Sequence, residues 1–549
     1  MKKIRMNTWR SNCLVTLLLP LAPVLLLAGC CKEDCPSLLP DCNCKDSVVT
    51  DTVRLYGVRW STDNPYDLGE RCFDAAGLTA HFGVGSHEGH SDFDSIYPWS
   101  EIRRCNVRNE NGQAIVTYEG EPGFSLDGSN GDVFVRIPKF CVEKYQKDGY
   151  EYRVVSKSGQ AGQGLQAATN RRVHPAFVED GQELDAIYVG AFEASMDSDS
   201  LLLSVGGVIP ASNIKAQQFL DAARQRGADY TLYDMRTVDM LFTLFAVEYG
   251  CRNTGTVFGY GIADYHQPCE YPWDEKHFYY SRKNERQTNS ITCHTEFLPR
   301  RMTVGTAICI CKGNQQDILT FAHLTDIEVH DTISVYTFDG PPIDITTDCF
   351  LGNCAQQTNW TETCTAPYHG HSGRANMVEA GFQPCERNPM RYRWVENVVG
   401  NLWHYLPDVT LYNRQLYVCS NMDDYCFGTH DGAYVAYSEQ LTVNNDNGTL
   451  DDVSQRNCWI TALIPDPELK GISLGCAYDR SLTSGAAFGA YYYIGNGLSI
   501  MVNGGGFDHR NRCNMLTTRA WSGTEYKWHL YGARLLYKPR PLPTSPRGR

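Results

Sequence analysis

The sequence predicts an α+β protein in which a small β-rich domain precedes a larger domain with two helices and a loop-rich β-sheet. Three observations predict this class. Strand-like alternation of apolar and polar residues is common before residue 210, where helical patterning is almost absent. Two stretches between residues 212 and 250 have apolar residues at helical spacing. Beyond Gly250 the chain returns to short strand-like runs, aromatic residues and loops rich in glycine and asparagine.

The β-rich domain is expected over residues 51–165. Residues 53–60 alternate apolar and polar side chains, and so do residues 133–138, which follow a Gly-Asp turn signal. A period of two is typical of strands that bury one face, because successive side chains point to opposite sides of a sheet. The larger domain is expected to follow over residues 166–538.

Two helices are predicted in the larger domain. The first is expected to begin at a cap formed by Ser212 or Asn213 and to end at Gly227. Asp234 can cap the second helix, which Gly250 ends. We expect the apolar faces of both helices to belong to the core.

Two segments are expected to lie outside the folded cores. Residues 264–300 are dense in charged and aromatic side chains, which predicts a long surface insertion. Residues 539–549 are basic and rich in proline, which predicts a disordered tail.

The first residues of the chain have the parts of an export signal. A segment with four cations and no acidic residue comes first, and an apolar run follows over residues 13–28. This run is too short to span a bilayer comfortably, and it leads into residues 27–30, Leu-Ala-Gly-Cys. These four residues resemble a bacterial lipobox. The resemblance implies that residues 1–29 are a signal peptide and that Cys30 carries lipid.

Residues 30–50, rich in cysteine, aspartate and proline, predict a tether between the lipid and the folded chain. Lys32, Glu33 and Asp34 resemble the triplet that directs Bacteroidetes-type lipoproteins to the outside of the outer membrane. The expected location is therefore the outer membrane, with the anchor at Cys30 and the protein facing the cell exterior. At about 0.8 kcal/mol per buried methylene, several acyl chains make a practically permanent anchor. An uncleaved signal anchor and an ordinary signal peptide are the alternatives.

The charge of the chain argues against nucleic acid as a partner. The sequence contains 63 acidic residues against 49 lysines and arginines, for a net charge of −14. Without the four cations of the signal peptide, the net charge is about −18. An acidic surface repels phosphate backbones, and no basic stripe offsets it.

The 23 cysteines predict disulfides. Cys13 leaves with the signal peptide and Cys30 carries lipid, so 21 remain in an oxidising compartment. Because this number is odd, at least one thiol stays free or pairs with another molecule. The two Cys-x-Cys sequences are too tightly spaced for a usual zinc site. No metal and no other cofactor is expected.

Several short motifs occur in an order that resembles one known fold. They lie at residues 174–177, 187–193, 233–237, 244–249, 388–393, 400–403, 501–507 and 531–535. In this order they resemble the C-type lectin fold, in the branch that includes phage tail proteins and formylglycine-generating enzymes. The resemblance covers roughly residues 170–538 and implies a C-type lectin-like domain. Residues 92–99 resemble a module that precedes this fold in phage-derived proteins.

Within that fold, the stretch between the last two strands resembles the variable region of proteins diversified by retroelements. In those proteins, reverse transcription alters template adenines, and the altered side chains crowd one exposed ligand-binding face. The resemblance implies a hypervariable binding face formed by Tyr478, Asp479, Arg480, Phe507, Asp508, His509, Arg510, Asn511, Arg512, Asn514 and Arg519. An ordinary loop without diversification is the alternative.

An enzyme is an alternative of a different class. Formylglycine-generating enzymes bind copper through two cysteines, but His509 and Asn514 stand at those positions here. Ser473 lies in a G-x-S-x-G sequence without the following helix that a nucleophile elbow requires. The spacing of His87 and His90 is one residue short of that in a zinc helix. We therefore expect no catalytic residues and no enzyme activity.

The expected function is ligand binding at the cell surface, as in an adhesin or receptor. Aromatic residues supply rigid contact area, while His, Arg, Asp and Asn supply adaptable hydrogen bonds. The expected ligand is a protein or a surface polymer. Two alternatives stay open: a formylglycine-generating-enzyme-like oxygenase, and a structural subunit of a phage-derived or pilus-like assembly.

If the face is diversified, the neighbouring DNA contains a reverse-transcriptase gene and a near-copy of the codons for residues 478–520. The copy is expected to differ from the gene only where the copy has adenine, because the process alters those positions. Sequencing the flanking DNA checks this expectation. A locus without such a copy contradicts diversification, although ligand binding does not depend on it.

Overall fold

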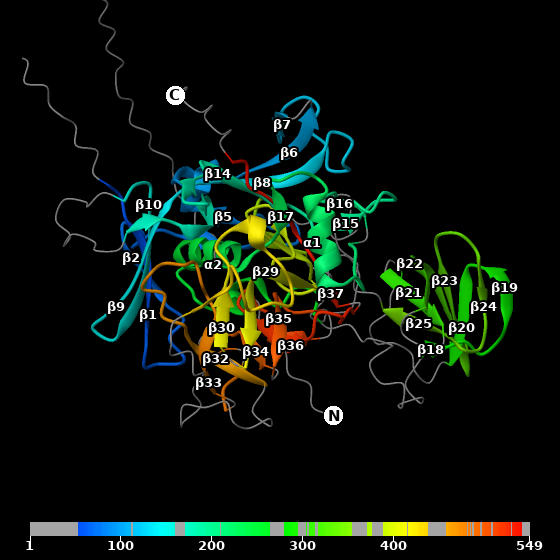
Figure 1. Cartoon of the computed structure of the whole chain (residues 1–549). Helices are drawn as coiled ribbons and strands as arrows, with labels where there is room; N and C mark the ends of the chain where they lie inside the picture. The colour runs from blue at the N-terminus through cyan, green and yellow to red at the C-terminus, as the bar shows by residue number, and fades with distance from the viewer. Residues whose placement is uncertain are drawn as a thin grey trace, which may run out of the picture. The chain divides into compact units, whose positions relative to one another are not determined.

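The computed structural model describes residues 53–540 except 111–112, 160–170, 209, 264–278, 295–303, 305–306, 313–316, 354–369, 376–387, 414, 438–456, 480, 484, 486–487, 495–496, 507–508 and 529. Strands dominate this part of the chain (Figure 1). It contains three α-helices, α1 (Ala216–Arg224), α2 (Met235–Tyr249) and α3 (Thr254–Phe258), against 38 strands. The prediction of an α+β, C-type lectin-like fold with two helices and a loop-rich sheet is therefore wrong. Segments that the local pattern leaves as loops pair with distant strands in several sheets, and such pairing leaves little local signal.

Both predicted helices form, and the ends of α2 are those predicted. Asp234 precedes the helix with an extended backbone, and its carboxylate accepts a hydrogen bond from the backbone N–H of Thr237 at 2.8 Å. Gly250 follows in the left-handed conformation, with a φ of 60°, which glycine adopts without a Cβ clash. α1 begins later than predicted, because Lys215 is its N-cap.

Two sheets contain most strands of the first half of the chain. One has the order β11 (Arg172–Val173), β9 (Cys141–Lys147), β10 (Tyr150–Ser156), β1 (Tyr56–Ser61) and β2 (Glu70–Phe73). The other has the order β17 (Tyr230–Leu232), β38 (Leu535–Tyr537), β14 (Ala186–Gly190), β8 (Asp132–Pro138), β6 (Arg103–Glu110) and β7 (Gln113–Tyr118). β8 pairs with β14, so strands from both expected domains, 51–165 and 166–538, belong to one sheet.

The largest sheet lies in the second half of the chain. Its order is β31 (Val435–Ala436), β30 (Gln415–Val418), β29 (Trp403–Tyr412), β35 (Leu498–Asn503), β36 (Thr518–Ser522), β34 (Tyr491–Ile494), β32 (Asn457–Leu463) and β33 (Gly475–Asp479), and β37 (Tyr531–Gly532) pairs with β29. A four-stranded sheet has the order β28 (Val395–Glu396), β27 (Met390–Tyr392), β26 (Gly373–Arg374) and β4 (Gly83–Val84). Three strand pairs form the remaining short sheets of this part: β12 (Val178–Glu179) with β13 (Gln182–Glu183), β15 (Ser195–Met196) with β16 (Leu202–Leu203), and β3 (Ala80–His81) with β5 (His90–Ser91).

Residues 279–353 form sheets of their own. One has the order β18 (Tyr279–Tyr280), β25 (Cys349–Asn353), β21 (Ala307–Lys312), β22 (Asp317–Val329), β23 (Ile333–Phe338) and β20 (Ser290–His294), and β19 (Glu285–Thr288) pairs with β24 (Ile343–Ile345). Ile291, Ile310 and Leu351 belong to a separate buried apolar cluster. The expected insertion, 264–300, thus covers only the first strands of this unit, and its residues 264–278 and 295–300 lie outside the described part of the chain.

α2 is buried along almost its whole length, from Met235 to Glu248. The buried residues include three with charged side chains, Arg236, Asp239 and Glu248. A buried charge costs several kcal/mol unless it is paired and hydrogen-bonded. The position of α2 therefore depends on what surrounds these three groups.

Asp239 is held by groups from several distant segments. Its carboxylate accepts hydrogen bonds from Lys144 Nζ at 2.7 Å, Arg153 Nη1 at 3.0 Å and Ser473 Oγ at 2.5 Å. Burial lowers the pKa of His174, so its ring is neutral, with Nδ1 accepting a backbone N–H and Nε2 donating to Asp239 at 3.0 Å. Burial opposes ionisation of Asp239, but Lys144, His174 and Arg153 hold its pKa well below the usual value.

Glu248, at the other end of α2, has an equally complete set of partners. Its carboxylate accepts hydrogen bonds from Arg393 Nε at 3.0 Å, Tyr392 Oη at 3.0 Å and Ser91 Oγ at 2.8 Å. Arg393 also pairs with Asp94 at 2.8 Å. Both ends of the helix are thus fixed by charged groups as well as by apolar packing.

We expect Asp239→Ala to lower the free energy of unfolding by about 3–5 kcal/mol, because it leaves the buried Lys144 and Arg153 without their shared carboxylate. Urea denaturation followed by circular dichroism measures this loss. The matched control is Glu183→Ala, whose 54% exposed carboxylate pairs with Lys139, and its expected loss is about 0–1 kcal/mol. Equal losses in the two variants would contradict the structural role given to Asp239.

Candidate ligand-binding face

The two faces of the largest sheet pack into different clusters. Ile460, Tyr492 and Met501 belong to the core cluster that contains α2. Their neighbours along the same strands include Trp459 and Tyr491, which belong to the second cluster. Because successive side chains of a strand point to opposite faces, Trp459 and Tyr491 lie on the second face.

Strand pairing arranges part of this second face as a row. Asp479 of β33 lies opposite Trp459 of β32, and Trp459 lies opposite Tyr491 of β34. The rings of Trp459 and Tyr491 meet edge to face, with centroids 4.9 Å apart, and are 9% and 8% exposed. Asp479 is half-buried, and its carboxylate accepts hydrogen bonds from the backbone N–H and hydroxyl of Ser481 at 2.7 and 2.6 Å.

Two arginines lie on the aromatic rings of this face. The guanidinium carbon of Arg512 is 4.9 Å from the ring centroid of Tyr491, and Arg512 is exposed. Arg519 of β36 lies 5.5 Å from the ring of Trp528 and 5.8 Å from that of Tyr531. Contacts of this kind contribute about 0.5–1 kcal/mol at exposed sites. We call Trp459, Asp479, Tyr491, Arg512, Arg519, Trp528 and Tyr531 the aromatic–cationic face.

Three of the predicted site residues therefore meet on one face of the sheet: Asp479, Arg512 and Arg519. Asn511 is also exposed, next to Arg512. His509 is half-buried and packs edge to face on Trp403, with ring centroids 5.0 Å apart.

Asn514 does not belong to this face, so its prediction as a ligand contact is wrong. Its side chain is fully buried. Nδ2 donates to the carbonyl of Phe488 at 2.9 Å, and Oδ1 accepts the backbone N–H of Leu516 at 3.2 Å. An asparagine in this role satisfies backbone groups of the interior and cannot reach a ligand.

The remaining predicted site residues cannot be assigned a side-chain position. Tyr478 lies in β33, where its backbone pairs with Ile460. The side chains of Tyr478 and Arg510, and the whole of Arg480, Phe507 and Asp508, lie outside the described residues. The same holds for the signal peptide, for Cys30 and for the tether.

The predicted disulfides do not form at eight described cysteines, which are free thiols: Cys72, Cys105, Cys141, Cys251, Cys349, Cys419, Cys426 and Cys476. Burial raises the pKa of Cys72 and of Cys105 to about 12, so both are protonated. A buried thiol of this kind packs as a small apolar side chain.

Of the predicted tail, 539–549, residues 541–549 lie outside the described residues, and Arg540 is held by three contacts. Arg540 Nε pairs with Asp229 at 2.9 Å, and the same guanidinium donates to Asp423 at 2.5 Å and to the carbonyl of Ala228 at 2.8 Å. The described chain therefore continues through Arg540.

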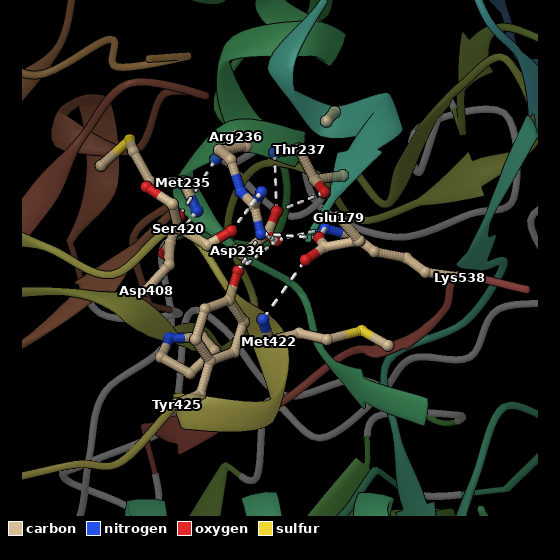
Figure 2. A network of polar contacts seen from close by, with 12 residues as sticks. Glu179, Asp234, Met235, Arg236, Thr237, Asp408, Ser420, Met422, Tyr425 and Lys538 are labelled. Carbon is tan, nitrogen blue, oxygen red and sulfur yellow. Dashed lines mark hydrogen bonds and ion pairs between the residues drawn. The ribbon is translucent and has the colours of Figure 1, made fainter. Parts of the chain in front are cut away.

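A second feature is a buried charge network that the sequence did not reveal (Figure 2). Lys538 Nζ lies 2.6 Å from Glu179 and 2.8 Å from Asp234, and Arg236 Nη2 lies 2.7 Å from Glu179. Asp408 accepts the backbone N–H of Met235 at 2.8 Å. These groups come from β12, α2, β29 and the C-terminal segment, so only Asp234, as a helix cap, had a local signal.

The network contains three carboxylates and only two cations. Burial favours the neutral form of Asp234, but Lys538 and Arg236 outweigh it and hold its pKa below the usual value. Asp408 receives less compensation, and burial together with the negative Asp234 raises its pKa to about 7. Asp408 is therefore the carboxyl that changes charge near neutral pH.

Searches among known proteins give this chain no family, since no family model and no curated protein matches it. The helices that the structure describes are all too short or too polar to cross a bilayer. The described residues also contain no group of three His, Cys, Asp or Glu side chains placed to hold a metal ion.

The contribution of Asp408 to stability is expected to fall as pH rises from about 4 to about 7, whereas the buried, neutral His174 contributes in the opposite sense. A raised folded-state pKa means that the folded state binds a proton more tightly than the unfolded state, so this stabilisation is complete below pH 3.8 and is lost through pH 7. Asp408→Asn removes the group, and we expect it to reduce the fall by about 1–4 kcal/mol. Burial also raises the pKa of Asp132, to about 6, so its contribution to stability falls with rising pH in the same direction as that of Asp408.

Urea midpoints measured at pH 4.5 and 7.5 test this expectation. Glu183→Gln, which neutralises an exposed carboxylate, is the matched control and is expected to leave the slope unchanged. An unchanged slope in Asp408→Asn would show that Asp408 does not titrate in this range.

Proposed function

We propose that this chain is a lipid-anchored protein of the outer membrane that binds a partner outside the cell through its aromatic–cationic face. The observation that carries the proposal is the placement of Arg512 and Arg519 over the rings of Tyr491, Trp528 and Tyr531. Arginine and aromatic side chains dominate the energetics of protein interfaces. The lipobox at Cys30 and the following charged triplet support the location.

The arrangement of the arginines suits recognition. A guanidinium that already rests on a ring loses less side-chain freedom on binding than one extended into water. A guanidinium can donate hydrogen bonds to a carboxylate, sulfate or carbonyl oxygen through the N–H groups at the edge of its plane.

The partner that fits this face is a protein or a surface polymer that presents anionic or carbonyl oxygens. Binding such a partner outside the cell is the function of an adhesin or a receptor. Hypervariability of the face remains a separate proposal, which the neighbouring DNA tests.

We expect Arg512→Ala/Arg519→Ala to weaken binding at least tenfold, because it removes both cations of the face. The fluorescently labelled mature chain can be titrated on bacterial and host cells and on their purified surface polysaccharides, with binding scored by flow cytometry or fluorescence anisotropy. Arg54→Ala/Lys147→Ala removes two exposed cations elsewhere and is expected to bind like the unaltered protein.

Unchanged binding by Arg512→Ala/Arg519→Ala would exclude this face as the binding site. Circular dichroism of that variant establishes that any loss of binding does not arise from unfolding. If the unaltered chain binds neither cells nor polymers, the proposed function itself fails.

Cys30→Ser tests the anchor. Without the thiol no thioether-linked lipid can form, so the protein is expected to lose label from radioactive palmitate and to leave the membrane fraction. Protease treatment of intact cells, followed by blotting, then reports whether the anchored protein faces the exterior. Retention of the label in Cys30→Ser would contradict lipidation at this position.

A further inference from the structure

A pocket of about 460 Å³ lies apart from the aromatic–cationic face, and none of that face's residues lines it. Pockets that hold small ligands have volumes of about 300–1,000 Å³, so this one is large enough for a small molecule. Three segments and one helical residue line it: residues 172–181, 420–421 and 468–470, together with Arg236 of α2.

Arg236 joins two walls of the pocket. Its Nη1 donates to the carbonyl of Val178 at 3.0 Å and to that of Ser420 at 3.1 Å. Its Nη2 donates to Glu179 at 2.7 Å, and its side chain is only 4% exposed. A buried guanidinium with this many fixed acceptors keeps both walls in place before any ligand arrives.

The third wall is fixed by Asp466. Its carboxylate accepts the backbone N–H groups of Lys470, Gly471 and Ile472 at 2.7, 3.0 and 3.2 Å. It also binds Lys144 Nζ at 3.0 Å, and that amine reaches Asp239 of α2. The loop is therefore attached to the same helix as the other walls.

Leu469, in this loop, has a left-handed backbone with a φ of 45° and is 3% exposed. This conformation is unfavourable for a side chain with a Cβ and costs on the order of 1–3 kcal/mol. It persists where the surrounding contacts over-determine it, as the hydrogen bonds to Asp466 do here. Backbone strain of this kind is concentrated at binding sites.

The lining combines apolar side chains with charges of both signs. Val173, Pro175, Val178 and Leu469 supply the apolar part. Lys470 and Glu468 pair with each other at 2.9 Å. Arg172 and Asp180 are exposed at the pocket, and the described residues offer neither of them an ion pair.

The pocket thus presents one cation, Arg172, and one anion, Asp180, beside an apolar lining, and neither has an ion pair among the described residues. A ligand that satisfies the cation, the anion and the apolar lining has a carboxylate, an ammonium group and an apolar body.

We infer that this pocket binds a short peptide in its zwitterionic form, of the size of a dipeptide with apolar side chains. Arg172 receives the terminal carboxylate and Asp180 the terminal ammonium group. The apolar side chains contact Val173 and Leu469. This site is independent of the aromatic–cationic face, and either can exist without the other.

Isothermal titration of the full-length protein in detergent micelles with the dipeptide Leu-Leu tests the inference. We expect binding that weakens at least tenfold when the peptide is N-acetylated, when it is C-terminally amidated, or when Gly-Gly replaces it. Arg172→Gln is expected to weaken binding of Leu-Leu by the same factor as amidation and to have no further effect on the amidated peptide. Asp180→Asn is expected to weaken binding of Leu-Leu by the same factor as acetylation and to have no further effect on the acetylated peptide.

Both substitutions are at exposed positions outside the buried network, so the variants are expected to fold, and their urea midpoints check this. Lys147→Gln is the matched control, an exposed cation that does not line the pocket, and it is expected to bind Leu-Leu normally. The inference is overturned if Leu-Leu does not bind at millimolar concentration. It is also overturned if the acetylated or amidated peptide binds as well as Leu-Leu, or if neither pocket variant weakens binding.

Discussion

The ionised side chains of α2 are the constraint on which the rest of the structure depends. A carboxylate cannot enter an apolar interior unless cations and hydrogen-bond donors surround it. Asp239 and Glu248 are surrounded in this way, and their partners include Lys144, His174 and Arg393. Since these partners are far apart in the chain, satisfying one helix requires that most of the chain be folded around it.

The same constraint shapes the pocket. Its walls are attached to the first turns of α2 through Arg236, and through Asp239 by way of Lys144 and Asp466. A wall held by buried charged hydrogen bonds moves little, because any displacement leaves a buried charge uncompensated. Rigidity of this kind favours binding of a defined ligand, because the walls lose little conformational entropy when the ligand binds.

The aromatic–cationic face depends on strand register instead. Asp479, Trp459 and Tyr491 form a row only because β33, β32 and β34 pair in one register. A shift by one residue would exchange the two faces, so that Trp459 and Tyr491 would point towards the cluster that contains α2, and Ile460 and Tyr492 towards the second cluster. The apolar side chains of the cluster on the α2 side disfavour that shift. They therefore also keep Asp479, Trp459 and Tyr491 in one row on the other face.

Local signals in the sequence determined the features that depend on neighbouring residues: the limits of α2 at Asp234 and Gly250, and the acidic composition. The export signal stays a prediction from the same kind of signal. The resemblance to a retroelement variable region selected Asp479, Arg512 and Arg519, which lie on one face of the sheet. Neither source determined the dominance of strands over helices or the burial of Asn514, because pairing and burial depend on residues far away in the chain. The tertiary structure alone decided which charges meet. The interior raises the energy of any unpaired charge, and only the assembled fold brings Lys538 to Asp234.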